Sequence, residues 1–438
     1  MSATAVILAA GFGTRMKSSL PKTLHGIAGK PMLRHLIDSC AEVFERIVVV
    51  VGPETEAVGR AAAPWPAVVQ HDRLGTAHAA LQAVDHFGDG EVAVLYADNP
   101  LITPDTLRRL LARRAAGDVG LALLAMRPAD PARYGRVIGA DGFVERIVEF
   151  ADATAAERAV GLCNAGVLCA HAARMLAWLR AVGNANAQGE YLLTDVAALA
   201  RAGGARVASV EAPEEELLGV NSRAELARAE RVVQGRLREA AMAGGVTMTA
   251  PETVFLSTDT VLGSDVTVGP SVVFGPGVTI ESGVEIRAFC HLEGCVVRAG
   301  AIVGPFARLR PGTDVGAGAH VGNFVELKAA SLGAGAKANH LAYIGDASVG
   351  AGSNIGAGTI TCNYDGFDKF RTEIGAGVFV GSDAILVAPV RIGDGAMVSA
   401  GSVITADVAP DAMAFGRARQ TEKPGGAAAF RAARGSKR

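Results

Sequence analysis

The chain has 438 residues, half of them apolar, and it carries 42 basic and 44 acidic side chains. This length predicts two or three domains with sizeable cores, and the charge balance lacks the basic excess typical of nucleic-acid-binding proteins. The apolar runs have strand length and are too short to span a bilayer. With no signal-peptide pattern at the start, we expect a cytoplasmic protein without membrane insertion.

Residues 1–220 alternate short apolar runs with amphipathic stretches. The runs are "TAVILAA", "RIVVVVG", "VAVLYAD" and "VGLALLAM", and the amphipathic stretches are 32–45, 75–87 and 103–116. Strands that alternate with helices predict an α/β, Rossmann-like domain whose mostly parallel sheet is covered on both faces. Ligands of such sheets bind beyond the carboxyl ends of the strands, which places Gly11–Arg15 and Asp98 in one crevice.

The segment "LAAGFGTRM" follows the first of these strands. It contains Gly11 and Gly13 but has Met16 where a dinucleotide fingerprint needs its third glycine, and it does not match a P-loop. We interpret it as a small-residue loop whose backbone N–H groups approach phosphate oxygens, with Arg15 and Lys22 as nearby cations. A tight turn with surface charges is the alternative.

Polar residues after the other strands extend this interpretation. A carboxylate at Asp98 is suited to Mg²⁺ that bridges nucleotide phosphates, although a turn or helix cap would need the same residue. Gln70 and the turn Gly75-Thr76 are suited to hydrogen bonds with a base. Asn221 either completes the metal site through its amide oxygen or begins the next helix.

A single helix is predicted over residues 222–243. Ser222 and Glu225 form a capping-box pattern at its start, and Gly244-Gly245 ends it. This helix is the expected connector between two domains.

After the connector, apolar residues recur at every sixth position. The in-phase runs extend over 262–292, 297–327 and 374–404, with a one-residue slip between the first two. Such hexapeptide repeats are typical of a left-handed parallel β-helix with three short strands per coil. The polar segment "TCNYDGFDKFRT" interrupts the pattern and predicts a loop that leaves the helix.

The coil length also brings charged residues together. At about 18 residues per coil, positions 310, 328 and 346 are expected to stack, so Arg310 and Lys328 form a cation pair suited to a phosphate. A charged pair on an outer face is the alternative. Spacing alone does not select a catalytic residue among His291, His320 and His340. The six cysteines lack CxxC spacing, and we expect isolated thiols.

The segment "LAAGFGTRMKSSLPK" is similar to the signature of sugar-phosphate nucleotidyltransferases. Together with "LGTAHA", "YADNPLI" and the hexapeptide repeats, the chain from about residue 3 to residue 423 resembles the bacterial bifunctional N-acetylglucosamine-1-phosphate uridyltransferase/glucosamine-1-phosphate acetyltransferases. The resemblance implies acetylation of glucosamine 1-phosphate by acetyl-CoA, then uridyl transfer from UTP. The product would be UDP-N-acetylglucosamine, a precursor of peptidoglycan and, in many species, of lipopolysaccharide. The resemblance also implies a homotrimer.

The resemblance further implies a set of site residues. Those for UDP-N-acetylglucosamine are Leu8, Ala9, Ala10, Gly11, Lys22, Gln70, Gly75, Thr76, Gly135, Glu149, Asn164 and Asn221, the sugar lying at Gly135, Glu149 and Asn164. Asp98 and Asn221 would hold Mg²⁺, with Arg15 and Lys22 as catalytic cations at the triphosphate. Glucosamine 1-phosphate would bind to Arg310, Lys328, Tyr343 and Asn354. Acetyl-CoA would bind to Ala357, Asn363, Tyr364, Ser382, Ala400 and Arg417, and His340 would be the general base.

The expected organisation is a uridyltransferase domain over 1–221, a helical linker over 222–245, an acetyltransferase β-helix over 246–423 and a flexible basic tail over 424–438. Ala97 and Ala151 depart from the family pattern, which usually has Gly and Lys there. Two other functions stay open. One is a uridyltransferase whose β-helix is only a scaffold, and the other is a non-catalytic hexapeptide subunit that retains nucleotide binding.

Overall fold

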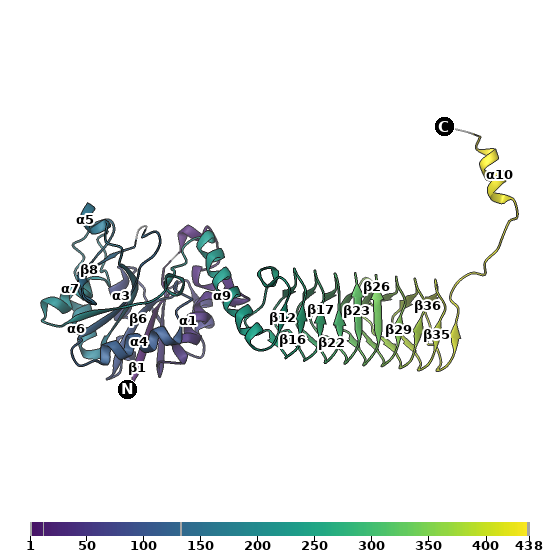
Figure 1. Cartoon of the computed structure of the whole chain (residues 1–438), viewed down its shortest axis with the longest axis horizontal. Helices are drawn as coiled ribbons and strands as arrows, with labels where there is room; N and C mark the ends of the chain where they lie inside the picture. Colours follow the sequence, from purple (N-terminus) through teal and green to yellow (C-terminus); the bar gives the residue numbers. More distant parts are fainter. Residues whose placement is uncertain (1, 12, 132–133, 436–438) are drawn as a thin grey trace. The chain divides into compact units, whose positions relative to one another are not determined.

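The computed structural model describes residues 2–11, 13–131 and 134–435. It divides into two compact units, Met1–Arg236 and Leu237–Arg438, and helix α9 (Arg223–Ala243) crosses the division (Figure 1). At the start of α9, Glu225 N donates to Ser222 Oγ at 3.3 Å, which is one half of the predicted capping box. In place of the second half, the Glu225 carboxylate accepts from Asn221 N at 2.8 Å and from Ser222 Oγ at 3.0 Å. No helix among the described residues is long and apolar enough to cross a membrane.

The N-terminal unit is built on one sheet with the strand order β5-β4-β1-β6-β10-β7-β11-β9-β8. Its strands are β1 (Ala3–Leu8), β4 (Arg46–Val51), β5 (Ala67–Val69), β6 (Glu91–Tyr96), β7 (Leu121–Met126), β8 (Arg136–Ala140), β9 (Phe143–Val148), β10 (Cys163–His171) and β11 (Val207–Glu211), and a separate hairpin pairs β2 (Gly26–Ile27) with β3 (Lys30–Pro31). The pairs around β1 are parallel, whereas β10 runs antiparallel to both β6 and β7. Every antiparallel pair of this sheet contains β9 or β10, and the other strands run in one direction, so the predicted mostly parallel sheet is confirmed in strand direction.

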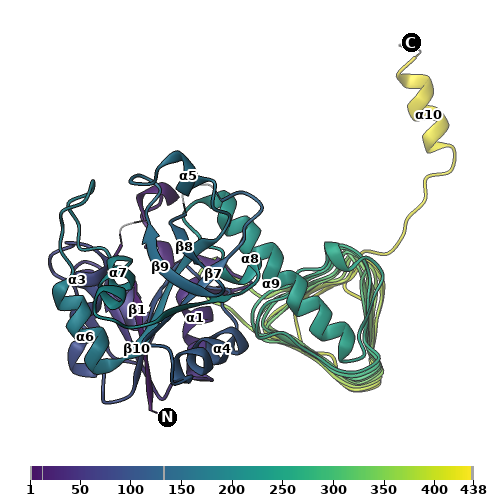
Figure 2. The ribbon, with the colours of Figure 1, turned by 60° about the vertical axis from the view of Figure 1, so that its left-hand side comes forward.

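Helices cover both faces of this sheet (Figure 2). They are α1 (Met32–Ala41), α2 (Glu56–Ala62), α3 (Thr76–Leu81), α4 (Pro104–Ala115), α5 (Ala155–Arg158), α6 (Ala172–Ala181), α7 (Asp195–Ala202) and α8 (Glu214–Leu217). Alternate residues of β1 enter two separate hydrophobic cores, Ala5 and Ile7 on one face and Val6 and Leu8 on the other. A strand buried on both faces reads as a continuous apolar run, which is why the sequence revealed it.

Two of the three predicted helices are shorter than expected. The helix predicted over 32–45 ends at Ala41, and the one predicted over 75–87 ends at Leu81, before a separate 3₁₀ turn at Val84–His86. The helix predicted over 103–116 is α4, where Thr103 accepts a hydrogen bond from Thr106 N. A side-chain cap fixes this helix start.

The C-terminal unit is a parallel β-helix whose coils overlie one another in a triangular outline (Figure 2). Sheet I contains β12 (Thr247–Met248), β14 (Thr267–Val268), β17 (Glu285–Ile286), β20 (Ile302–Val303), β23 (His320–Asn323), β26 (Lys337–His340), β29 (Asn354–Ile355), β32 (Phe379–Val380), β35 (Met397–Val398) and β37 (Met413–Ala414). Sheet II contains β13 (Val261–Leu262), β16 (Thr279–Ile280), β19 (Cys295–Val297), β22 (Thr313–Val315), β25 (Ser331–Leu332), β28 (Ala347–Val349), β31 (Thr372–Ile374) and β34 (Val390–Ile392). Sheet III contains β15 (Val273–Phe274), β18 (His291–Leu292), β21 (Arg308–Leu309), β24 (Glu326–Lys328), β27 (Tyr343–Gly345), β30 (Ile360–Cys362), β33 (Ile385–Val387) and β36 (Val403–Ile404). The hexapeptide positions form the core of this unit.

The strand register corrects one prediction about stacking. Arg308 pairs with Glu326, 18 residues later, but Lys328 pairs with Gly345, only 17 residues later. The residue that stacks on Lys328 is therefore Gly345, and Asp346 lies at the corner beyond it with φ at 47°. A coil can lose one residue at a corner because the inward side chains of its strands still stack on those of the neighbouring coil, as Leu327 does on Ile344.

The interruption predicted after Ile355 is a loop. Val349 pairs with Ile374, 25 residues later, so this coil carries extra residues, and a bridge between Tyr364 and Lys369 closes the loop that they form. All six cysteines are free thiols, as expected. Within the tail predicted to be flexible, Gly426–Ala433 forms helix α10, none of whose residues is buried, and residues 436–438 lie outside the described part of the chain.

Candidate active sites

A cavity of about 690 Å³ lies at the carboxyl ends of β1 and β6 in the N-terminal unit. Most of the predicted nucleotide-site residues line it, namely Leu8, Ala9, Ala10, Gly11, Lys22, Gln70, Gly75, Thr76, Asp98 and Glu149. The parallel strands bring these residues together from distant parts of the chain, as expected for an α/β sheet.

The loop after β1 approaches the next segment closely. Gly13 has φ at 62°, and a Cβ there would lie 2.5 Å from the Cβ of Lys22. Only glycine allows both the left-handed backbone and this approach. The contact fixes the base of the Lys22 side chain against the loop. Arg15, by contrast, is exposed on a 3₁₀ turn (Thr14–Met16) and is absent from the cavity lining.

Lys22, Asp98 and Asn221 form one cluster. Lys22 Nζ lies 2.6 Å from Asp98 Oδ2 and 2.8 Å from Asn221 Oδ1. A backbone hydrogen bond of 2.8 Å from Val220 N to Asp98 O joins the segments that carry the two oxygens. The predicted metal ligands thus converge on one point, which the Lys22 ammonium occupies. No group of three or more His, Cys, Asp or Glu side chains suited to a metal occurs in the described part of the chain.

Gln70, which is predicted to contact the base, is buried. Its Nε2 lies 3.1 Å from Gly75 O and 3.1 Å from His78 Nδ1. Gly75 has φ at 124°, and a Cβ there would lie 2.5 Å from Tyr191 O, so this turn requires glycine. Leu193 N donates to Thr76 Oγ1 at 2.9 Å. The turn is therefore held rigidly against residues 191–193.

The predicted sugar residues also lie together. Asn164 N donates to Gly135 O at 2.8 Å, and a Cβ on Gly135 would lie 3.5 Å from a Glu149 carboxylate oxygen. Of these three residues only Glu149 is part of the cavity lining, and Thr194 Oγ1 donates to it at 3.0 Å. Burial raises the pKa of Glu149, although the hydrogen bond from Thr194 partly opposes this.

A buried carboxylate with a raised pKa lowers the stability of the fold as it ionises. The folded state binds the proton of Glu149 more tightly than the unfolded state, so the stability contribution is present at low pH and is lost as pH rises through the raised pKa. We expect Glu149→Gln to increase the melting temperature of the N-terminal unit at pH 7.5 by on the order of 2 °C, and to weaken sugar binding. Differential scanning calorimetry at pH 5 should show a smaller gain. An equal gain at both pH values would contradict the linkage.

Sequence reasoning missed Arg73 as a cavity residue. Arg73 Nε donates to Ala10 O at 2.9 Å, and its guanidinium lies against Gly52, where a Cβ would be 2.4 Å from the Arg73 NH2 nitrogen. The Arg73 side chain thereby holds the backbone of the phosphate loop at Ala10. Its position next to "LGT" was the only signal in the sequence. Of the departures from the family pattern, Ala97 is buried and Ala151 is exposed.

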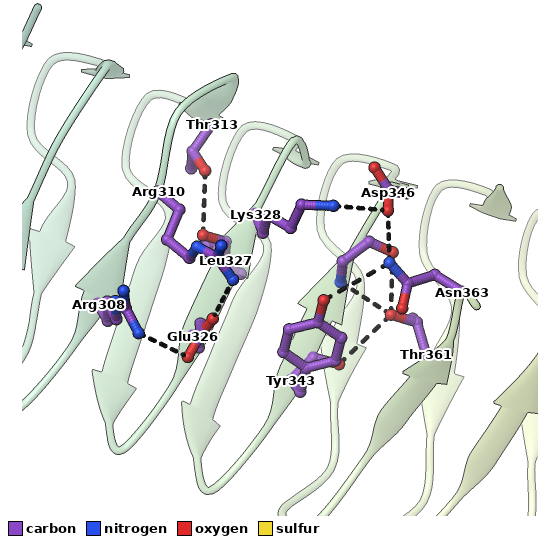
Figure 3. A network of polar contacts seen from close by, with 11 residues as sticks. Arg308, Arg310, Thr313, Glu326, Leu327, Lys328, Tyr343, Asp346, Thr361 and Asn363 are labelled. Atoms are coloured by element: carbon purple, nitrogen blue, oxygen red, sulfur yellow. Dashed lines mark hydrogen bonds and ion pairs between the residues drawn. The ribbon is translucent and has the colours of Figure 1, made fainter. Parts of the chain in front are cut away.

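In the β-helix, the predicted cation pair lies on neighbouring coils of sheet III (Figure 3). Arg310 donates to Glu326 at 2.9 Å, and Lys328 Nζ lies 3.0 Å from Asp346 Oδ2. The hydrogen bond to Asp346 raises the pKa of Lys328. Each predicted phosphate-binding cation is thus paired with a carboxylate from the following coil.

Asp346 also contacts the predicted acetyl-CoA residue Asn363, whose Nδ2 donates to Asp346 Oδ2 and lies 3.5 Å from Tyr343 Oη (Figure 3). Burial pushes the pKa of Asp346 upward, but the hydrogen bonds from Lys328 and Asn363 outweigh it and leave that pKa below its usual range. One carboxylate therefore links residues predicted to bind two different substrates.

His340 lies at the end of β26 and is exposed. Its Nδ1 lies 2.7 Å from Asn323 Oδ1, on the preceding coil. Both residues line a second cavity of about 430 Å³. Asn354 lies on sheet I beside Lys337, so the structure does not place it on sheet III with Arg310, Lys328 and Tyr343.

Three predicted acetyl-CoA residues form a column at one corner of successive coils. Asp383 N donates to Ala357 O at 2.7 Å and Gly401 N donates to Ser382 O at 2.8 Å, so Ala357, Ser382 and Ala400 follow one another. Arg417 continues the column, since a Cβ on Gly401 would lie 3.7 Å from its Cδ. Tyr364 is exposed on the inserted loop.

Both units are similar to known protein families. Residues 5–161 match the family model of the MobA-like NTP transferase domain, and residues 259–294 and 371–406 match that of the bacterial transferase hexapeptide (six repeats). The chain is 66% identical to the bifunctional protein GlmU of Acidiphilium cryptum, with 100% of both chains covered. It is 68% identical to that of Gluconacetobacter diazotrophicus, over 98% of this chain and 94% of the relative, and 64% identical to that of Granulibacter bethesdensis, over 98% and 96%.

Proposed function

The chain belongs to the family of bifunctional GlmU proteins, and we propose that the two sites described above carry out its two reactions. It is a transferase that acetylates glucosamine 1-phosphate with acetyl-CoA and then transfers a uridyl group from UTP to N-acetylglucosamine 1-phosphate, with release of pyrophosphate. We propose below which residues carry out each reaction. We also propose that the protein acts in the cytoplasm.

Uridyl transfer is assigned to the cavity of the N-terminal unit. The observation that supports this most strongly is the convergence of the phosphate loop, Gln70 and Asp98 on one cavity. Because Gln70 Nε2 already donates to the Gly75 carbonyl oxygen, we assign the side-chain carbonyl oxygen of Gln70 to the N3–H of uracil. Glu149 is assigned to a sugar hydroxyl. The sugar phosphate itself attacks the α-phosphorus, so the protein supplies positioning and charge rather than a nucleophile.

Asp98 and Asn221 are assigned to Mg²⁺. Their donor set fits this ion, because a carboxylate oxygen and an amide oxygen point at one cation, Lys22, which stands in for the metal. Mg²⁺ commonly takes one or two protein oxygens and fills its other positions with water and substrate phosphates. When bound, the ion neutralises charge that develops on the phosphates.

Acetyl transfer is assigned to the β-helix. Arg310 and Lys328 are proposed to bind the sugar phosphate, and the corner column at Ala357, Ser382 and Ala400 is proposed to bind acetyl-CoA. Because Asn323 Oδ1 can only accept a hydrogen bond, His340 Nδ1 carries the proton and Nε2 keeps its lone pair. Nε2 is then the base that removes a proton from the 2-amino group as it attacks the thioester.

The acetyltransferase site is proposed to be completed in a trimer. Within one chain, Asn354 lies on sheet I, whereas the cation pair lies on sheet III. Contact between two chains can bring residues of different sheets together. Next to this site, Phe289, Phe306 and Phe324 form an exposed ladder, with ring centroids 4.8 and 5.1 Å apart. An exposed apolar ladder of this kind is typical of an interface.

Substitution in the ladder tests the trimer. Phe324→Glu would bury three like charges at the interface, so we expect monomers and at least about a hundredfold loss of acetyl transfer, with uridyl transfer retained. Sedimentation velocity measures the assembly. Val261→Glu, which replaces an equally exposed side chain on sheet II, is the control. A trimeric and active Phe324→Glu variant would show that the ladder is not the interface.

A further inference from the structure

Lys22 occupies the position to which both proposed metal ligands point. Its Nζ lies 2.6 Å from Asp98 Oδ2 and 2.8 Å from Asn221 Oδ1, and the side chains of Lys22 and Asp98 are only 13% and 20% exposed. An ammonium group has three donors, and two of them are used here. The contact is therefore a specific, largely buried arrangement and differs from a loose surface ion pair.

The groups around this ammonium are held in place by the backbone. Lys22 begins a short 3₁₀ turn (Lys22–Leu24), and its Cβ packs against Gly13. Asp98 and Asn221 are tied through the bond from Val220 N to Asp98 O. Only the outer part of the Lys22 side chain is free to move, and it lies in the same cavity as the phosphate loop.

A lysine ammonium and Mg²⁺ cannot share these two oxygens. Mg²⁺ needs oxygen ligands at about 2.0–2.1 Å, so it would lie at nearly the same point as Nζ, and the two cations would repel each other strongly. The metal therefore enters only when the ammonium leaves. The triphosphate of UTP supplies the negative charge that can hold Lys22 in its new position.

We propose that Lys22 is a positioning residue that closes the metal site in the nucleotide-free enzyme and transfers to the triphosphate when Mg²⁺ and UTP arrive. This inference rests on the proposed assignment of Mg²⁺ to Asp98 and Asn221. It makes metal and nucleotide binding interdependent, because the metal alone must displace an internal cation, whereas metal and nucleotide together give Lys22 a new partner.

Binding of Mn²⁺ to the nucleotide-free protein tests the proposal. Free Mn²⁺ is measured by electron paramagnetic resonance for the full chain and for Lys22→Met, which keeps the length of the side chain but removes its charge. If the site is open in about one molecule in ten, Lys22→Met binds Mn²⁺ about tenfold more tightly. Lys30→Met is the matched control, since Lys30 forms an ion pair of 2.8 Å with Asp38 elsewhere in the unit. It should leave Mn²⁺ affinity unchanged.

A gain in affinity cannot come from a merely damaged fold. Unchanged or weaker Mn²⁺ binding in both Lys22→Met and Lys22→Ala, with normal melting temperatures, would overturn the proposal. Asp98→Asn separates this failure from that of the metal assignment. If Asp98→Asn leaves Mn²⁺ binding intact, the proposed metal site is wrong. If it abolishes binding while Lys22→Met shows no gain, only the role of Lys22 is wrong.

Discussion

Asp98→Ala is expected to lower the rate of uridyl transfer by on the order of 10³-fold and to leave acetyl transfer within twofold of the unmodified protein. The carboxylate is the only charged group of the proposed metal pair. Its loss also leaves Asn221 as the one hydrogen-bond partner of Lys22 Nζ among the described residues. Release of pyrophosphate from UTP and N-acetylglucosamine 1-phosphate measures the first reaction, and release of the coenzyme A thiol measures the second.

Asp105→Ala provides the control for this experiment. Asp105 is an exposed carboxylate in the first turn of α4 and lies outside the cavity lining. Its substitution should change neither reaction. Loss of both reactions in Asp98→Ala would contradict two independent sites, and full uridyl transfer would remove Asp98 from the metal site.

His340→Ala is expected to lower acetyl transfer by about 10²- to 10⁴-fold, the range usual for loss of a general base. Without the imidazole, no group positioned by Asn323 can take the proton from the 2-amino group. Uridyl transfer from supplied N-acetylglucosamine 1-phosphate should be preserved, because His340 belongs to the C-terminal unit. The thiol assay with glucosamine 1-phosphate and acetyl-CoA measures the effect.

His291→Ala is the matched control for this second experiment. His291 is an exposed histidine on sheet III and does not line the cavity that contains His340. Acetyl transfer that survives in His340→Ala would show that another group is the base. No acetyl transfer from the unmodified protein would leave the β-helix as a scaffold, which is the alternative that the sequence kept open.

The sequence determined the architecture of both units because their patterns depend on local periodicity. A strand buried on both faces requires a continuous apolar run, as in β1. A parallel β-helix requires an inward side chain at every sixth position, and the phase of Leu309 and Leu327 predicted their pairing, which the register confirms. The start of α9 was equally local, since Ser222 and Glu225 bond to each other at the first turn of the helix.

Only the tertiary structure decided how the site residues meet. A coil that is one residue shorter placed Gly345 on Lys328 and moved Asp346 to the corner, where it contacts both Lys328 and Asn363. The sequence shows this shortening only as a five-residue step between the buried Leu327 and Leu332, and such a step does not tell which outward side chains then meet. The support of Ala10 by Arg73 and the place of Lys22 between Asp98 and Asn221 likewise arise from segments far apart in the chain. Contacts of this kind depend on how the strands assemble and leave no periodic trace in the sequence.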